Sequence, residues 1–301
     1  MSKVKIFSIY YSKQNLFHGK AIKTDIIEPI QTGKAATGWD LGMLSDDTGD
    51  NISSKNPYYG ELTCWYWVWK NWLPQHPECE YIGFTQYRRM LQLGEDRKVD
   101  RRKVVDSYLV SVTKKDFIKI VKTISYDNIK NYDLVLPYRM SYYSTNEDAY
   151  KRYALYYRPE LYDLGVKLLL QQGETVNNID KLRNSLSGYH KCNFIMTAKL
   201  FIECMEWLFN FLFKLEIFDN KFNGYNTTNK WNRAAAYITE YFINLFYLSL
   251  IERKLRIKEA MLYEARFYKK LIKDEIDMRK FKKTNYWREY VPKNIIDCSM
   301  L

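Results

Sequence analysis

The order of apolar and polar positions along the 301-residue chain predicts short strands that alternate with helices. Val4–Tyr11 is apolar, β-branched and aromatic, without a helical period, which is typical of a buried first strand. Glu80–Thr85, Tyr132–Pro137 and Cys192–Thr197 are short runs that we interpret in the same way. Because stretches with helical spacing separate these strands, the pattern favours an α/β fold with a mostly parallel sheet flanked by helices.

The clearest helix is predicted to begin at Asn56, which can cap it, because Pro57 suits the first helical position. Apolar residues recur through it at helical spacing, and we assign its tryptophans to the core. Further helices are predicted over residues 114–123, 146–157, 159–172, 199–215 and 233–252.

Residues 12–57 are rich in Gly, Asp, Asn and Thr, and we predict that they are mostly loop. In parallel sheets, ligands bind beyond the carboxyl ends of the strands. Three polar segments could lie at such ends, namely 44–56, 85–89 and 138–148. A long loop without regular structure in a compact domain is usually functional or disordered, so the first of these segments is a candidate site.

Charge changes this picture at the C-terminal end. The chain carries 47 Lys and Arg against 35 Asp and Glu, a formal net charge of +12. Residues 253–288 hold 13 of the basic and 5 of the acidic residues, with apolar positions at near-helical spacing. We therefore predict a basic amphipathic helical tail over 253–301 beside a main domain over 1–252. Such a helix can lie on an anionic membrane surface. A helix packed on the domain, or a dimer contact, is the alternative.

Several classes of protein are disfavoured by what the sequence lacks. Its five cysteines form no CxxC pair and its three histidines no HExxH, so we expect neither a disulfide framework nor a zinc cluster. The N-terminus has no signal-peptide core, and the longest uncharged apolar run, Tyr241–Ile251, is too short to span a bilayer. Gly-x-Ser-x-Gly, P-loop and Gly-x-Gly-x-x-Gly motifs are absent, which leaves nucleophilic catalysis without support and argues against a dehydrogenase.

Two adjacent arginines, Arg88 and Arg89, follow the predicted strand Glu80–Thr85. Guanidinium groups bind phosphate oxygens bidentately and stay charged at any relevant pH, so this position suits a polyanion. A surface pair bridged to acidic residues elsewhere is the alternative.

A second candidate is the loop segment from Asp46 to Ser53, in which carboxylates and amides cluster around a glycine. Such groups suit the recognition of hydroxyls, or of a hard cation such as Mg²⁺ or Mn²⁺. The segment also leads into the helix N-terminus at Asn56, where anions bind well. A solvated acidic turn is the alternative.

Two glutamates on predicted helices are candidates for a general base. Glu61 lies one turn in from the start of the tryptophan-rich helix, where it either faces a cleft or complements the helix dipole. Glu240 and Arg233 lie two turns apart on another helix and share one face. A structural ion pair at the edge of the core is the alternative for the second pair.

These segments resemble a family of bacterial capsular and exopolysaccharide biosynthesis proteins that are classed as glycosyltransferases. The family's Asp-Asp-x-Gly-Asn/Asp-Asn-Ile-Ser block stands here as Asp46–Ser53, and its Glu-Leu-Thr-x-x-Tyr-Trp-x-Trp-Lys-Asn block as Glu61–Asn71. Its Tyr-Ile-Gly-x-x-His-Tyr-Arg-Arg block is similar to Tyr81–Arg89, with Gln86 in place of the His. Its Asn-x-Phe-Ile-Met segment is similar to Cys192–Met196, where a cysteine takes the Asn position.

The resemblance implies transfer of a sugar from a nucleotide-activated donor, with UDP-sugars favoured, on a GT-A-like fold. The implied acceptor is a growing capsular, exopolysaccharide or lipid-linked glycan, and no nucleic-acid partner is expected. Such a transfer needs neutralisation of the leaving diphosphate, orientation of sugar hydroxyls and, if it inverts, a carboxylate base. We assign the diphosphate to Arg88 and Arg89 without a tightly held metal, and leave open an assisting divalent cation, Mg²⁺ or Mn²⁺.

As the base we rank Asp50 first, Glu61 second and Glu240 third. For binding of the donor we add to the two arginines Tyr87, Asp46, Asp47, Asn51, Ser53 and Asn193. No residue is assigned as a metal ligand. We expect a soluble, cytoplasmic transferase that attaches peripherally to the inner face of the cell membrane.

Two other classes of function stay open. The net charge and the 27 Tyr would also serve a nucleic-acid-binding protein, through phosphate contacts and base stacking. No RRM, KH or helix-turn-helix signature supports that alternative. A non-catalytic scaffold within a polysaccharide assembly complex is the third class.

Overall fold

The computed structural model of the protein describes residues 2–94, 104–106, 109–142, 144–153, 159–190, 192–223 and 233–265. A seven-stranded sheet lies at its centre, with the strand order β12-β8-β11-β4-β1-β2-β3. Its strands are β1 (Val4–Tyr10), β2 (Ile27–Gln31), β3 (Leu44–Ser45), β4 (Tyr81–Gln86), β8 (Leu134–Pro137), β11 (Phe194–Thr197) and β12 (Ile257–Ala260). Within this sheet β11 is antiparallel to both neighbours, and the other neighbouring strands pair in parallel. The predicted mostly parallel α/β sheet is thereby confirmed.

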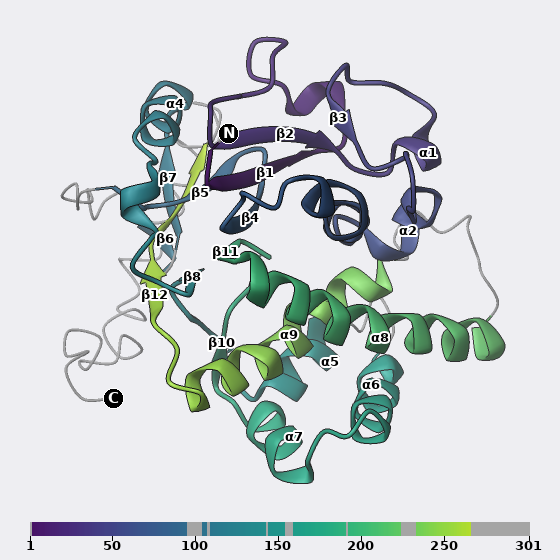
Figure 1. Ribbon diagram of the computed structural model, residues 1–301. Helices are drawn as coiled ribbons and strands as arrows, with labels where there is room; N and C mark the ends of the chain where they lie inside the picture. Colours follow the sequence, from purple (N-terminus) through teal and green to yellow (C-terminus); the bar gives the residue numbers. More distant parts are fainter. Residues whose placement is uncertain are drawn as a thin grey trace, which may run out of the picture.

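Helices and a second sheet cover the two faces of the main sheet (Figure 1). The helices are α1 (Lys34–Thr37), α2 (Asn56–Tyr59), α3 (Leu62–Trp67), α4 (Lys114–Lys122), α5 (Asn146–Tyr153), α6 (Glu160–Gln171), α7 (Val176–Arg183), α8 (Ala198–Asn223) and α9 (Ala234–Glu252). Side chains of β1 alternate between the two faces, so that Phe7 and Ile9 join the core against α3, α8 and α9. Val4 and Ile6 join a separate core against α4 and the second sheet.

The second sheet has the strand order β5-β13-β7-β6, and two of its strands continue strands of the main sheet. Its strands are β5 (Arg89–Leu91), β6 (Val104–Asp106), β7 (Leu109–Val112) and β13 (Leu262–Ala265). β5 follows β4 after the turn at Tyr87 and Arg88, and β13 follows β12 after Met261. A short pair, β9 (Met140–Ser141) and β10 (Ser187–Gly188), completes the strands of the described residues.

The predicted helical tail is wrong for its first part, because residues 257–265 form β12 and β13. β12 pairs with β8 in the main sheet, and β13 lies between β5 and β7. Pairing on these strands satisfies the backbone groups of a segment whose side chains alone suggested a helix. Residues 266–301, the rest of the predicted tail, lie outside the described residues.

The helix predicted from Asn56 is interrupted at Gly60, which divides it into α2 and α3. Gly60 adopts φ 56° and ψ −134°, a backbone conformation that residues with a Cβ rarely adopt. A Cβ at this position would also lie 3.1 Å from the Cβ of Ala236. The glycine therefore lets the start of α9 approach the start of α3, which brings Glu61 close to the residues of α9. The chain continues after α3 as a π-helix, Val68–Trp72.

Helix α9 is long and apolar enough, by length and hydropathy, to cross a membrane. Most of it is instead buried in the protein, where Ile238, Phe242 and Leu250 are fully covered. Its apolar character is thus accounted for by packing against α2, α6, α7 and α8.

Candidate active site

The candidate site lies at the carboxyl edge of the main sheet, where β1 and β4 end side by side. Because β11 is antiparallel to β4, the residues before β11 reach the same edge. Thr85 Oγ1 in β4 lies within hydrogen-bond distance of two groups, 2.7 Å from Asn193 Oδ1 and 2.6 Å from the backbone oxygen of Arg89. The predicted segment 85–89 is therefore at the carboxyl end of a strand, and Asn193 is buried beside it.

The two arginines share one buried carboxylate. Arg89 Nε donates to Glu264 Oε1 at 3.3 Å, and Arg88 Nε lies 3.1 Å from the same oxygen. The contact of Arg88 is an ion pair without hydrogen-bond geometry, since its buried Nε has no hydrogen-bond partner among the described residues. Side-chain exposure is 9 % for Arg89 and 37 % for Arg88. Arg88 is therefore the more accessible of the two arginines to a ligand.

Tyrosines line the same turn. The Tyr87 ring lies 5.8 Å from that of Tyr10 and 6.0 Å from that of Tyr11, centroid to centroid. The guanidinium carbon of Arg88 lies 5.8 Å from the Tyr87 centroid, within the range of a cation–π contact. Tyr11, just after β1, is 47 % exposed and offers a flat surface beside Tyr87.

Gln86 links the arginines to Glu61. Arg89 Nη1 donates to Gln86 Oε1 at 2.6 Å, and Gln86 Nε2 donates to Glu61 Oε2 at 3.2 Å. An amide has both a donor and an acceptor, so it joins a guanidinium to a carboxylate in one chain of hydrogen bonds. The residue that replaces a histidine of the resembled family thus has a defined positioning contact here.

Glu61 is the residue before the first turn of α3, and its carboxyl group is desolvated. Burial and the nearby negative charge of Glu240 raise its pKa from 4.5 to about 6. Arg233, Gln86 and Arg89 favour the carboxylate and limit this rise. A carboxylate with a pKa near 6 is ionised at neutral pH but can hold a proton, which suits a general base.

Glu240 of α9 forms a pair of carboxylates with Glu61, and His190 lies beside Glu240. Glu240 Oε2 lies 3.5 Å from His190 Nδ1. Burial and the charges of Glu61 and Glu240 raise the pKa of the Cys192 thiol well above its usual value, so this cysteine stays a neutral thiol. Glu61, Glu240, His190 and Cys192 therefore converge from α3, α9 and the entry to β11.

The loop residues Asp46 and Ser53, which we predicted to bind the donor, make contacts within the protein. Asp46 is fully buried and accepts hydrogen bonds from Gly33 N at 2.8 Å, Ser53 Oγ at 2.6 Å and Thr63 Oγ1 at 2.5 Å. Ser53 is also fully buried, and it accepts from Ala35 N at 3.0 Å. Their oxygens hold the loop on α1 and α3 and are not presented to a ligand.

The contacts of the other predicted loop residues are with groups other than the two arginines. Asp50 accepts from Tyr66 at 3.0 Å, and its backbone N–H donates to Asn71 Oδ1 at 2.9 Å. Asn71 lies ten residues after Glu61, roughly 15 Å further along the helical segment. Asp47 accepts from Ser45 Oγ at 2.6 Å, and Asn51 donates to the backbone oxygen of Gly49 at 2.9 Å.

The described contacts of this loop are with α1, α3 and the π-helix after α3, and not with Arg88 or Arg89. The oxygens of Asp46 are occupied by N–H and O–H donors, so this carboxylate is not available to a cation. Within the described ranges, no three His, Cys, Asp or Glu side chains cluster as a metal site would require.

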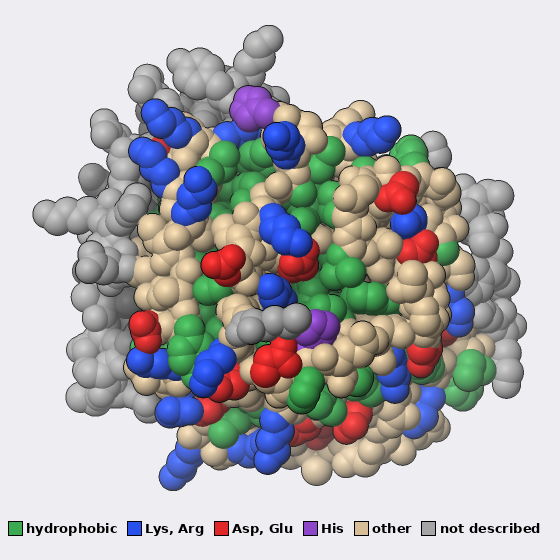
Figure 2. Space-filling view, turned by 45° about the horizontal axis from the view of Figure 1, so that its top comes forward, with side chains coloured by type: hydrophobic (Ala, Val, Ile, Leu, Met, Phe, Trp, Pro, Cys, Tyr) green, Lys and Arg blue, Asp and Glu red, His purple; other side chains and the backbone are tan. Residues whose placement is uncertain are grey.

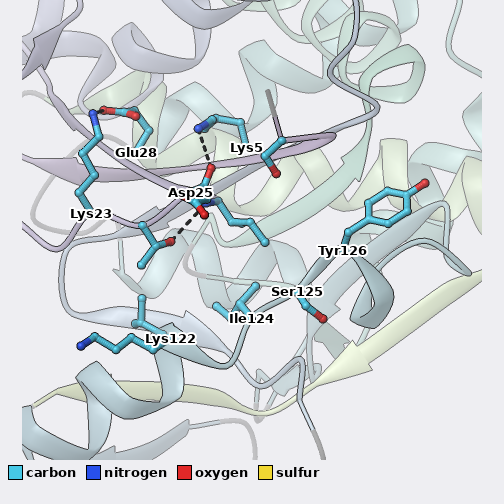
Figure 3. A pocket seen from close by; sticks show the side chains of 12 residues that line it. Lys5, Lys23, Asp25, Glu28, Lys122, Ile124, Ser125 and Tyr126 are labelled. Carbon is cyan, nitrogen blue, oxygen red and sulfur yellow. Dashed lines mark hydrogen bonds and ion pairs between the residues drawn. The ribbon is translucent and has the colours of Figure 1, made fainter.

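A wide hollow of about 710 Å³ lies at the opposite edge of the sheet, at the amino ends of β1 and β2 (Figure 3). Lys5 donates to the backbone oxygen of Asp25 at 2.8 Å, and Lys23 pairs with Glu28 at 2.7 Å. Since ligands of parallel sheets bind at the carboxyl edge, we do not assign the functional site to this hollow.

Comparisons with known proteins identify the family and a structural neighbour of the chain. Residues 9–252 match the model of a family described as a domain of unknown function, DUF4422. The chain belongs to the DUF4422 family. It is also similar to the apo structure of WbbM, a bifunctional glycosyltransferase, with 29 % sequence identity and a TM-score of 0.74. The alignment covers 89 % of this chain and 46 % of WbbM, so the chain spans about half the length of that protein. A search of curated proteins finds no significant match.

The DUF4422 match ends before β12 and β13, although β13 supplies a residue of the site. Glu264, which holds both arginines, lies opposite Arg89 in the register of β13 and β5. Glu259 of β12 accepts from Arg139 at 3.1 Å and from Tyr189 at 2.5 Å. The segment 257–265 therefore belongs structurally to the same unit as the DUF4422 region.

Sequence reasoning did not select Glu264 or His190. The signal for Glu264 was a short run, Leu262–Ala265, with a carboxylate among apolar residues. His190 stands two residues before the Cys192 segment that resembles the family, and it is one of three histidines in the chain. Both residues acquire their contacts from segments far away in the sequence.

Proposed function

We propose that this member of the DUF4422 family is a glycosyltransferase that uses a nucleotide-sugar donor, with UDP-sugars favoured. The observation that carries the proposal is the convergence of Arg88 and Arg89 with Glu61 and Glu240 at the carboxyl edge of the sheet. The similarity to WbbM, itself a glycosyltransferase, supports the same reaction class. The acceptor we propose is a growing capsular, exopolysaccharide or lipid-linked glycan.

The arginines would stabilise the leaving nucleoside diphosphate. Charge develops on the diphosphate oxygens as the bond to the anomeric carbon breaks, and guanidinium groups in a partly buried site stabilise that charge strongly. Arg89 is fixed by Glu264 and Gln86, whereas Arg88 is half exposed and its Nε is without a hydrogen bond. Arg89 thus supplies a preorganised charge, and Arg88 can turn onto the phosphate.

Glu61 replaces Asp50 as the base that we propose. A carboxylate takes the proton of the acceptor hydroxyl while that oxygen bonds to the anomeric carbon. The bond to the diphosphate oxygen breaks with its electron pair, which inverts the anomeric centre. Glu61 has the raised pKa, the contact with Gln86 and the neighbouring arginine that this role needs. Asp50 is anchored at Asn71 instead, and Glu240 is the second candidate.

The chain would act at the inner face of the cell membrane, as a cytoplasmic, peripherally bound enzyme. The proposal rests on the basic residues after Ala265, which include Arg266, Lys269 and Lys270. Clusters of Lys and Arg bind anionic lipid surfaces and lipid diphosphates by charge. In the lower half of the face in Figure 2, acidic side chains of the described residues lie among the basic ones, whereas basic ones gather at its upper left.

The test is release of a nucleoside diphosphate. The full chain is incubated with UDP-glucose, UDP-galactose or UDP-N-acetylglucosamine and a methyl-glycoside acceptor that receives the sugar, and UDP is quantified by chromatography, with and without EDTA. We expect UDP release that persists in EDTA and is lost in the Arg89→Lys variant. Absence of release from every nucleotide sugar, together with tight and steeply salt-dependent RNA binding, would overturn the proposal. Complete loss in EDTA would overturn the metal-independent role of the arginines.

A further inference from the structure

A narrow pocket lies beside the carboxylate pair, between the entry to β11 and α9. Its polar lining comes from His190, Cys192, Asn193 and Glu240, and Tyr189 and Ile243 add apolar surface. The free volume is about 10 Å³, close to the space that one water molecule or one hydroxyl group occupies. The pocket can therefore admit a single oxygen, and no larger group, without movement of its walls.

His190, one of the residues that line this pocket, has a ring nitrogen without a described hydrogen-bond partner. Its side chain is 4 % exposed, and its Nε2 is buried without a hydrogen-bond partner among the described residues. Two tyrosine rings hold the imidazole edge-on, with centroids 5.1 Å away for Tyr142 and 4.9 Å away for Tyr241. The ring is thus fixed in place by aromatic packing, while its Nε2 makes no hydrogen bond to the described residues.

The contact with Glu240 decides what the free nitrogen can do. Glu240 Oε2 lies 3.5 Å from Nδ1, and the tautomer that matches this contact carries its proton on Nδ1, toward the carboxylate. Nε2 then has a lone pair and accepts a hydrogen bond. A buried acceptor that makes no hydrogen bond costs stability, so native proteins keep few of them without a function. The partner that fits is an O–H donor.

Building on the proposed function, we propose that this pocket is a subsite for one sugar hydroxyl, which donates to His190 Nε2. The pocket adjoins Glu61 and Glu240, whose charges both act on Cys192 in its wall. A hydroxyl seated there would place a sugar ring next to the carboxylate pair. His190 is then a residue that determines which sugars bind, and both a donor sugar and an acceptor sugar offer the required group.

Two substitutions separate the two ring nitrogens. His190→Asn places an amide near Nδ1, where it can face Glu240, and removes the acceptor at Nε2. His190→Gln extends an amide toward Nε2 and keeps an acceptor there. Calorimetry measures the affinity of both variants for UDP and for UDP-glucose, UDP-galactose and UDP-N-acetylglucosamine. UDP alone reports the arginine site, and the extra affinity of the UDP-sugar reports the sugar.

For a donor hydroxyl, we expect UDP to bind all three proteins equally. The extra affinity of the best UDP-sugar should fall about tenfold in His190→Asn and largely persist in His190→Gln. Deoxy analogues of that sugar identify the hydroxyl, because one analogue should bind about tenfold more weakly to the wild type but not to His190→Asn. For an acceptor hydroxyl, donor affinity stays constant, and His190→Asn raises the KM of a methyl-glycoside acceptor instead.

The inference is overturned if His190→Asn changes neither the extra affinity of the UDP-sugar over UDP nor the KM of the acceptor. The pocket then holds only a structural water. That result leaves UDP binding and turnover intact, and so leaves the proposed function standing. Failure of the wild type to bind UDP and to release it from UDP-sugars overturns the proposed function, and the hydroxyl subsite with it. Circular dichroism of each variant checks that the fold is retained.

Discussion

The raised pKa of Glu61 makes the stability of the protein depend on pH in a direction that can be measured. Burial and Glu240 raise this pKa from 4.5 to about 6, a change of about 1.5 units. At about 1.36 kcal/mol per unit, the folded state is about 2 kcal/mol less stable once Glu61 ionises. Because the folded protein binds the proton more tightly, the contribution is most favourable below pH 4.5 and is lost as pH rises through about 6.

Replacement of Glu61 by Gln removes this dependence while the contact with Gln86 can persist. The free energy of unfolding is measured by urea denaturation at pH 4 and at pH 7.5 for both proteins. Between these two pH values, the variant should gain about 2 kcal/mol relative to the wild type. Turnover should fall about 10²- to 10⁴-fold, because the acceptor proton loses its base. In the wild type, kcat/KM should rise with pH through about 6.

A matched control separates this effect from a general one. Glu206 is exposed on α8, and Glu206→Gln should leave both the pH dependence and the turnover unchanged. If the stability difference between Glu61→Gln and the wild type is the same at both pH values, the raised pKa is wrong. If Glu61→Gln keeps full turnover, Glu61 is not the base.

Three further outcomes follow from the same contacts. Glu240→Gln removes the repulsion that raises the pKa of Glu61, so the acid limb of the kcat/KM profile should shift to lower pH; an unchanged limb contradicts this. Glu264→Gln leaves two guanidinium groups without their carboxylate, and urea denaturation should show a loss of about 3–5 kcal/mol; a loss under 1 kcal/mol would count against the buried pair. A chain of residues 1–265 should release UDP normally but fail to float with anionic liposomes; equal flotation of both chains refutes the membrane role.

Much of the fold follows from local patterns in the sequence. The strands β1, β4, β8 and β11 are apolar runs bounded by polar residues, and the structure confirms each of them. The same holds for α4, α6 and α9, whose apolar spacing is helical. These elements bury one stripe or both faces, so the pattern of side chains is enough to reveal them.

Strand β2 was hidden in the predicted loop because Pro29 interrupts it. Proline cannot donate to a sheet, so it usually marks a strand as unlikely. Here Thr32 N donates to Tyr10 O of β1, and Gln31 O accepts from Asp46 N just after β3. Backbone groups of alternate residues in a strand point to the same side, so the nitrogen of Pro29, like the groups of Gln31, faces β3. β3 pairs with Ile30 and Gln31, beyond Pro29, so no hydrogen bond of the ladder is lost.

The candidate site was predicted where its signal is local and missed where it depends on distant pairing. Arg88 and Arg89 directly follow β4, so their place at the sheet edge could be derived from the strand alone. Glu264 meets Arg89 across 175 positions of sequence, through a strand whose residues are buried on both faces and show no alternation. Asp46 has the composition of a ligand-binding residue, but the amide of Gly33 and neighbouring hydroxyls use its oxygens.

The binding of UDP to arginine variants tests the central claim most directly. Calorimetry compares the wild type with Arg88→Gln and Arg89→Lys. Arg253→Gln is the control, because Arg253 lies at the end of α9 and pairs with Glu203 of α8. If the two arginines hold the diphosphate, the Kd of UDP rises at least about tenfold in both site variants and stays constant in the control. An unchanged Kd in both site variants, with the fold retained, would contradict the account.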